Sequence, residues 1–154
     1  MKSLCNLEAV DWTHVKDFIL QEGFYLFGGF LEGAMPTNEL WILKSELENL
    51  RWIKGNTLGQ APEPRYQQAM IHYPKENALI VSGGRNDKIQ MIYADLYFLA
   101  LDTLTWMKVD CIRGQGFLSL ADHMFINFRE NDFLIFGGID TTYKLSNKIT
   151  MLSF

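Results

Sequence analysis

The sequence from Ala78 to Gly84, ALIVSGG, is a short apolar run that ends in a pair of glycines. Two other runs end in the same way, FYLF before Gly28-Gly29 and FLIF before Gly137-Gly138. The first glycines of Gly28-Gly29, Gly83-Gly84 and Gly137-Gly138 are separated by 55 and 54 residues. Short apolar runs that end at glycine are typical of buried strands rather than helices. The spacing therefore indicates three copies of one repeat.

Two further landmarks keep the same period. Trp52 and Trp106 are 54 residues apart. A second signature follows each glycine pair, at residues 38–41 (NELW), 94–97 (ADLY) and 147–150 (NKIT). The interval from the second glycine to the apolar residue of this signature is 11, 12 and 11 residues. Because several kinds of landmark stay in step over three copies, the repeat is the strongest signal in the sequence.

Residues 37–51 are open to a second interpretation. Leu40, Leu43, Leu47 and Leu50 follow the spacing of an amphipathic helix, and Thr37 is a suitable N-cap. The corresponding residues 95–106 of the next copy have the pattern of a strand, a tight Asp-Thr turn and a second strand. We therefore predict strand–turn–strand in both copies, with the two extra residues of the first copy in its turn.

Each repeat is then expected to hold four short antiparallel strands, of which the second ends at the glycines and the fourth carries the tryptophan. Four such strands in a unit of about 50 residues are the pattern of a β-propeller blade. A blade is apolar on both faces and must stack on its neighbours. We expect one all-β domain over residues 1–154, with blades at 12–54, 65–110 and 119–154 and the last blade lacking its fourth strand.

The glycine pair, the Asn/Asp-x-Leu-aromatic signature, the tryptophan and Pro62-Glu63-Pro64-Arg65 together resemble the kelch repeat, from about His14 to Phe154. The resemblance implies four-stranded blades around a central channel. Most members of that family are interaction modules, and a minority are enzymes. The Arg-x-Gly-His stretch of the family is degenerate here, since it reads RYQQ at residues 65–68 and since Ser119 aligns with Arg65 in the next copy.

The number of blades is too small for a closed ring. A closed propeller has roughly 4–8 blades, and this chain supplies two and three quarters. Its end blades alone would expose more apolar surface than the roughly 300–600 Å² of the largest patch on a typical monomer. We expect either that the chain is part of a longer protein with further blades in cis, or that it completes its ring by self-association.

The repeat signature is expected to serve the fold. A glycine adopts a positive φ and allows another backbone to approach closely, so each pair is expected at a sharp turn beside a neighbouring blade. The large aromatic side chains of the signature are expected to fill the space between adjacent sheets. These structural residues are Gly28, Gly29, Gly83, Gly84, Gly137, Gly138, Trp41, Trp52, Tyr97 and Trp106.

Function is therefore expected in the loops that vary between copies. One set follows the glycine pairs, at residues 30–37, 85–93 and 139–145, and a second set joins the blades, at 55–64 and 110–118. Polar side chains of the first set are candidates for charge-assisted hydrogen bonds to a protein partner, and the alternative is that they are solvated turn residues. The candidate partner-binding residues are Arg85, Asn86, Asp87, Lys88, Glu32 and Asp140.

Composition and charge narrow the classes of protein. The 154 residues are 48% hydrophobic and carry a net charge of −4, so the chain can build a core and is a poor binder of phosphate backbones. No signal peptide or membrane-spanning run is recognisable, and the two cysteines, Cys5 and Cys111, imply no disulfide framework. We expect a cytoplasmic protein that binds protein, and neither nucleic acid nor membrane.

No catalytic pattern stands out. The histidines and cysteines lack the spacing of metal ligands, and His14 and His123 share a repeat position that fits the start of a strand. Gly114-Gln115-Gly116 lacks the remainder of a nucleotide-binding motif, and Ser82 lacks the glycines of a nucleophile elbow. We expect a kelch-type interaction or scaffold module without catalytic activity, metal or cofactor. The alternatives are part of a metal-dependent propeller enzyme with its ligands on missing blades, or an architectural component of a larger assembly.

Overall fold

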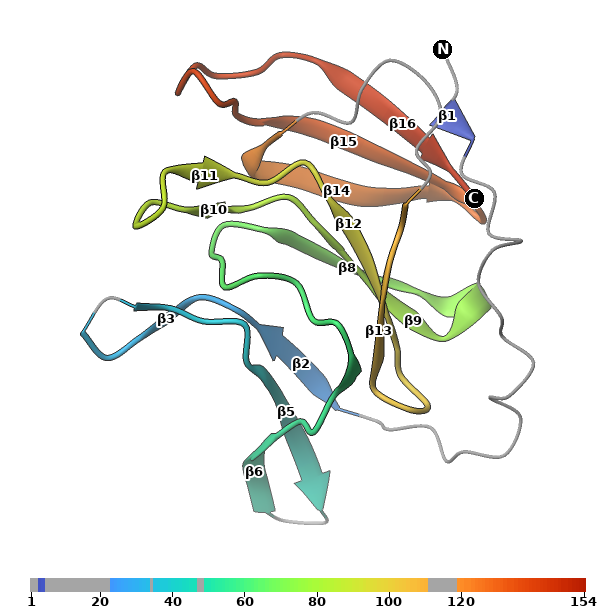
Figure 1. Cartoon of the computed structure of the whole chain (residues 1–154). Coiled ribbons are helices and arrows are strands. Elements are labelled where there is room, and N and C mark those ends of the chain that lie inside the picture. The colour runs from blue at the N-terminus through green and yellow to red at the C-terminus, as the bar shows by residue number, and fades with distance from the viewer. Residues whose placement is uncertain (1–2, 5–22, 34, 47–48, 111–118) are drawn as a thin grey trace.

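The computed structural model describes residues 3–4, 23–33, 35–46, 49–110 and 119–154. These residues form strands, turns and one short 3-10 segment, η2 (Pro74–Glu76), and no α-helix occurs among them. Figure 1 shows three twisted sheets that follow one another along the chain and lie side by side. The predicted all-β fold with an incomplete ring is confirmed.

The first sheet has three strands, in the order β2 (Phe24–Phe27), β5 (Leu40–Glu46) and β6 (Asn49–Lys54). β5 and β6 form an antiparallel hairpin in the segment whose leucine spacing also fits a helix, so the strand prediction is confirmed there. Pairing as strands puts Leu40 and Ile42 on the buried side of the sheet, whereas a helix would bury Leu43 and Leu47 with Leu40. The predicted first strand of this blade lies outside the described residues.

The second sheet has five strands, in the order β7 (Leu58–Gly59), β13 (Thr105–Lys108), β12 (Leu96–Ala100), β9 (Ala78–Ser82) and β8 (Ala69–Tyr73). The last four are antiparallel, and β7 from the inter-blade segment adds to the edge of β13 in parallel. Every residue of β9 and β12 is buried. This sheet is therefore covered on both faces.

The third sheet has the order β1 (Ser3–Leu4), β16 (Ile149–Ser153), β15 (Asp132–Ile139) and β14 (Ala121–Arg129). β14, β15 and β16 are antiparallel in the predicted order. β1 pairs with the free edge of β16, where a fourth strand is predicted to be missing, and it runs parallel to β16. An N-terminal segment thus covers part of the edge that β13 occupies in the second sheet.

The registers of the first two sheets show which positions of the repeat correspond. Leu43 pairs with Trp52 in the first sheet, and Leu99 pairs with Trp106 in the second. Beyond these pairs, the hairpin of the first sheet continues to Glu46 and Asn49, whereas that of the second ends at Ala100 and Thr105. The two extra residues of the first copy were predicted in its turn, but each strand of its hairpin instead pairs two residues further than in the second copy, which leaves two residues rather than four between the paired strands.

Two apolar clusters join the three sheets. The first cluster contains Phe27, Leu40 and Ile42 of the first sheet together with Leu79, Val81, Tyr97, Leu99 and Trp106 of the second. The second cluster joins the opposite face of the second sheet to the third sheet, through Tyr73, Ala78, Ile80, Leu96, Phe98, Phe125, Phe133, Ile135 and Leu152. Successive residues of β9 alternate between the two clusters, as the two-residue period of a strand requires.

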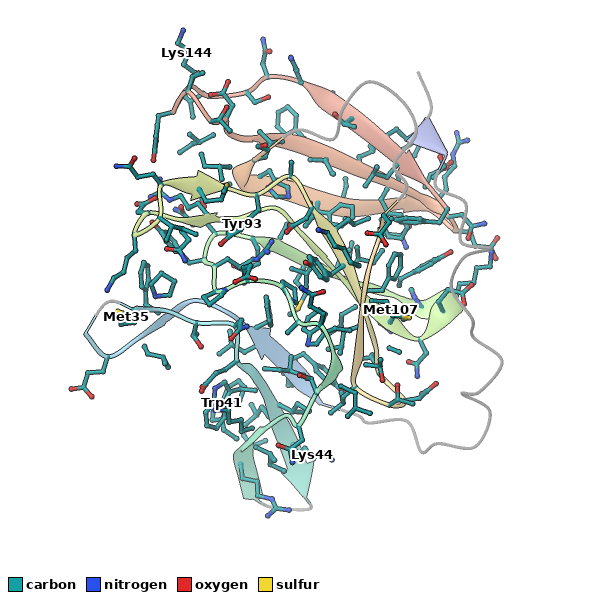
Figure 2. All side chains as sticks on the ribbon, viewed as in Figure 1. Met35, Trp41, Lys44, Tyr93, Met107 and Lys144 are labelled. Carbon is teal, nitrogen blue, oxygen red and sulfur yellow. The ribbon has the colours of Figure 1, made fainter. Side chains whose placement is uncertain are left out.

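The four aromatic residues of the repeat signature have different surroundings. Trp106 is 3% exposed, and its ring lies 4.9 Å from that of Phe27 in the neighbouring sheet. Tyr97 is buried in the same cluster. Trp52 is 51% exposed and Trp41 is partly exposed, so neither fills a space between the described sheets, and their expected place between blades stays a prediction. Trp41 lies on the face of the first sheet that is turned away from the second (Figure 2), and the strand pairing puts Trp52 on the same face.

We predict that replacing Trp106 by alanine lowers the free energy of unfolding by about 3–5 kcal/mol, because the change removes a buried ring between two sheets. Trp52→Ala is the matched control, since the same ring is half exposed there and its loss should cost about 1 kcal/mol or less. Urea denaturation of both variants measures the difference. Equal losses would contradict the different burial of the two tryptophans.

Candidate functional site

The loops that follow the glycine pairs project from the same edge of the three sheets (Figure 1). The first is the hairpin of β3 (Phe30–Leu31) and β4 (Met35–Pro36), and the second is that of β10 (Arg85–Asn86) and β11 (Met91–Ile92). The third loop is closed by a bridge between Ile139 and Leu145. Figure 2 labels Met35 in the first loop and Lys144 in the third.

The second glycine of each pair closes the base of its loop in the same way. The carbonyl of Gly29 accepts a hydrogen bond from the amide of Thr37 at 3.0 Å. The corresponding bonds run from Tyr93 to Gly84 at 2.9 Å and from Ser146 to Gly138 at 2.8 Å. All six glycines have a positive φ. The repeat in the sequence thus produces three loops with one common base.

The first two glycine pairs also hold the chain that enters the next blade. The amide of Gly84 donates to the carbonyl of Leu120 at 2.8 Å, and a Cβ added to Gly83 would lie 2.3 Å from the same oxygen. The pair Gly28-Gly29 holds the carbonyl of Arg65 in the same manner. Only a residue without a side chain allows this approach. The pairs therefore act as contact points between successive blades.

These bonds correct one alignment of the repeat. Ser119 was expected to correspond to Arg65, but the bond from Gly84 selects Leu120. Leu120 is also buried, as Arg65 is. The spacing of this position is therefore 55 residues rather than the 54 that separates the tryptophans.

Arg65 is the most constrained side chain next to the loops. It is 0% exposed, and its guanidinium donates to both carboxylate oxygens of Asp95, at 2.5 and 2.9 Å. The same group donates to the carbonyl of Gly83 at 2.9 Å, and its carbon lies 3.9 Å from the ring centre of Tyr93. Since the Arg65 carbonyl is held by the first glycine pair, this one residue joins two blades.

The buried ion pair was not predicted from the sequence. In the sequence, the two partners are the arginine of the Pro-x-Pro-Arg stretch and the aspartate of the ADLY signature, 30 residues later. The corresponding positions of the third copy are Leu120 and Lys148, which cannot form such a pair. Leu120 instead joins the second apolar cluster.

Of the predicted partner-binding residues, Arg85 and Asn86 are held within the hairpin. The backbone of Arg85 exchanges two hydrogen bonds with that of Tyr66, and its guanidinium lies 5.1 Å from the Tyr66 ring centre and 3.6 Å from the Asp87 carboxylate. Asn86 is buried, and its side chain donates to the Pro64 carbonyl at 3.0 Å and accepts from the Lys88 amide at 3.1 Å. These two residues shape the loop more than they face solvent.

The other four predicted residues lie nearer to solvent. Asp87, Lys88 and Glu32 are exposed, and the ammonium of Lys88 contacts the sulfur of Met35 in the neighbouring hairpin. Asp140 accepts three hydrogen bonds within its own loop, from the hydroxyl and amide of Thr142 and from the Lys144 amide. These bonds lower the pKa of Asp140. The structure thus brings the first two loops together and gives Asp140 a role inside the third.

The sequence did not indicate the apolar side chains that the first two hairpins expose. Phe30 packs on Tyr66 with ring centres 4.3 Å apart, and Arg85 contacts the same Tyr66 ring. Burial raises the pKa of Tyr66, and a hydrogen bond with Asp87 adds to the effect. We use the name post-glycine surface for eight exposed residues of these hairpins: Phe30, Leu31, Glu32, Met35, Asp87, Lys88, Ile89 and Met91.

A buried serine and histidine lie between the second and third sheets. Ser82 Oγ is 3.0 Å from His123 Nε2, and both side chains are buried. At the corresponding positions of the preceding interface, Gln68 donates to the carbonyl of Phe27 at 2.6 Å. The shared position shows that the Ser82–His123 contact joins two blades. Burial lowers the pKa of His123 to about 4.

The described part of the chain contains no group of three or more His, Cys, Asp or Glu side chains that would hold a metal ion. It also contains no helix with the length and apolarity needed to cross a bilayer. His14, Cys5 and Cys111 lie outside the described residues.

Comparisons with known proteins agree with this fold. A family model described as the KLHDC2/KLHL20/DRC7 Kelch-repeats domain matches residues 13–154. Dynein regulatory complex subunit 7 of Chlamydomonas reinhardtii is 33% identical over 100 residues, which are 63% of this chain and 8% of that protein. Tip elongation aberrant protein 1 of Schizosaccharomyces pombe is 32% identical over 103 residues, which are 64% of this chain and 9% of that protein. The chain thus spans less than a tenth of either relative.

Solved structures show the same fold at low sequence identity. The structure of YjhT superposes with a TM-score of 0.62 at 14% identity, over 99% of this chain and 42% of that one. A chain in the cryo-EM structure of RAG in complex with one melted and one unmelted RSS superposes with a TM-score of 0.60 at 17% identity, over 89% of this chain and 49% of that one.

We predict that the chain loses stability between pH 6.5 and about 4 through His123. In this range the unfolded imidazole binds a proton and the folded one does not, so the free energy of unfolding falls as the pH falls. The full loss is on the order of 3 kcal/mol. His123→Gln, which copies the amide of Gln68, should show a flatter pH dependence in urea denaturation. An unchanged pH dependence would show that His123 titrates alike in both states.

Proposed function

Because the chain belongs to the kelch-repeat family, we propose that it is a protein-interaction module that binds a protein partner through its post-glycine surface and has no catalytic activity of its own. The family match covers residues 13–154, which is most of the chain. Kelch-repeat domains serve as interaction modules, and the closed, repeated base of each loop suits that use.

The observation that carries the proposal is the contact between the first two hairpins. Lys88 of the second hairpin touches Met35 of the first, and Phe30 of the first packs on Tyr66, which the second hairpin binds through its backbone. The two loops therefore form one continuous surface on a rigid scaffold. A surface fixed in this way binds a partner with little loss of loop entropy.

The chemistry of the surface selects the kind of partner. Exposed Leu31, Ile89 and Met91 provide apolar contact area, and the exposed charges beside it are Glu32, Asp87 and Lys88, so negative charge is in excess there. We therefore favour an apolar protein segment flanked by basic residues. The net charge of −4 supports a protein partner rather than nucleic acid, and we place the protein in the cytoplasm without membrane attachment.

A second function is supported by one relative. By its name, the Chlamydomonas protein is a subunit of the dynein regulatory complex. In this alternative the module has an architectural role and holds part of a larger assembly together through the same surface. A metal-dependent enzyme, the other alternative, would need a set of metal ligands beyond those that the described residues bring together.

Variants of the post-glycine surface test the proposal. We predict that Leu31→Asp and Ile89→Asp, one on each hairpin, remove most of the proteins that proximity labelling in cells finds near the wild type, because each change puts a charge into an apolar contact. Leu58→Asp on β7 is the control, since Leu58 is exposed but lies outside the surface. Labelling that both hairpin variants leave unchanged would overturn the proposed site. Partners that stay constant across cell states would favour the architectural role.

A further inference from the structure

The first and third sheets each leave one apolar face uncovered by described residues. On the first sheet, the face turned away from the second carries the exposed side chains Phe24, Leu26, Leu50 and Trp52. On the third sheet, the face turned away from the second carries Met124, Ile126 and Phe136. We call these the backward face and the forward face. Apolar surfaces of this kind on a folded domain mark places where another surface packs.

The interface between the first and second sheets shows which residues such faces bring together. It joins Phe27, the residue before the first glycine pair, to Trp106, which lies on the fourth strand of the next blade. The corresponding residue on the forward face is Phe136, and on the backward face it is Trp52. The forward face therefore carries the counterpart of Phe27, and the backward face carries the counterpart of Trp106. Together they could repeat the contact that the first and second sheets already form.

The third glycine pair supports the same pairing. A Cβ at Gly83 would lie 2.3 Å from the Leu120 carbonyl of the following blade, whereas a Cβ at Gly137 would have no described atom within 4 Å. Gly137 nevertheless keeps a positive φ of 74°, close to that of Gly28 at 70°. The forward face thus retains the open corner into which the chain of a following blade fits.

Part of the charge at the rim of the backward face is already paired. Lys54 and Glu39, two charged residues described there, form an ion pair with each other. This pair lowers the pKa of Glu39. The apolar centre of each face can therefore be covered without burying either of these two charges unpaired.

We propose that two copies of this chain close a ring head to tail, with the forward face of each copy packed on the backward face of the other. Three sheets in each copy give six, within the roughly 4–8 blades of a closed propeller. The chain also covers 42% and 49% of the two solved structures that share its fold, which is close to half. A two-fold axis makes both contacts identical, so the ring leaves no apolar face open.

Sedimentation equilibrium of the 154-residue chain tests the proposal. The expected mass is twice 17.8 kDa. Phe136→Asp and Trp52→Asp should each raise the dissociation constant of the dimer at least about a hundredfold, because each buries a carboxylate in both contacts. Both side chains are about half exposed within one copy, and circular dichroism checks that the variants remain folded. Leu58→Asp, on the exposed strand β7 of the middle sheet, is the control that should stay dimeric.

Mixing the two variants distinguishes this arrangement from others. In a dimer of one Phe136→Asp copy and one Trp52→Asp copy, one contact carries both changes and the other keeps Phe136 opposite Trp52. The mixture should therefore form dimers that neither variant forms alone, as measured by energy transfer between differently labelled copies. A dimer that forms through one face only would survive one of the two changes and would not need the mixture.

Each other outcome overturns the proposal. A folded monomer of the wild type would show that the two faces do not bind each other, and a series of growing oligomers would show that the contact does not close. Leu31→Asp and Ile89→Asp should keep the dimer, because they lie outside both faces. Failure of the ring would therefore leave the proposed binding surface unaffected, and failure of that surface would leave the ring unaffected.

Discussion

Arg65 is the residue on which the relation between the first two blades depends. Its carbonyl is held by Gly29, and its buried guanidinium binds Asp95 and the carbonyl of Gly83 in the next blade. A buried arginine is stable only when its donors are satisfied, so Asp95 and Gly83 must remain in place. The loops begin at the glycine pairs, so the position of the first two loops depends on the contacts that Arg65 makes with those pairs.

The repeat period alone was enough to predict the strands and the stacked sheets, because Gly28, Gly83 and Gly137 mark one backbone corner in every copy. Positions that depend on a partner strand were less accessible. Ser119 was aligned with Arg65 because the sequence does not show that the second inter-blade segment has one extra residue. The hydrogen bond from Gly84 to Leu120 reveals it. The expected place of Trp52 between sheets stays a prediction, because no described sheet covers its face of the first blade.

The sequence predicted where the candidate site lies, but not which side chains it exposes. The variable loops after the glycines do share one edge (Figure 1), but Asn86 and Arg85 are used to build the second hairpin. Apolar side chains such as Leu31 and Ile89 were not recognised, since an isolated apolar residue in a loop gives no sequence pattern. Only the fold shows that the two hairpins place them on a common surface.

Amide hydrogen exchange at Gly29 and Gly84 tests the central contact most directly. Both amides donate to the chain that enters the next blade, and both should exchange far more slowly than in the unfolded chain. In an Arg65→Ala variant, protection at Gly29 and Gly84 should fall at least roughly tenfold more than at Ser146, because Arg65 positions its own carbonyl for Gly29 and binds the Gly83 carbonyl of the peptide that carries the Gly84 amide. The Ser146 amide bonds to Gly138 in the third loop and serves as the reference. A loss of protection that is the same at Gly29 as at Ser146 would contradict the role assigned to Arg65.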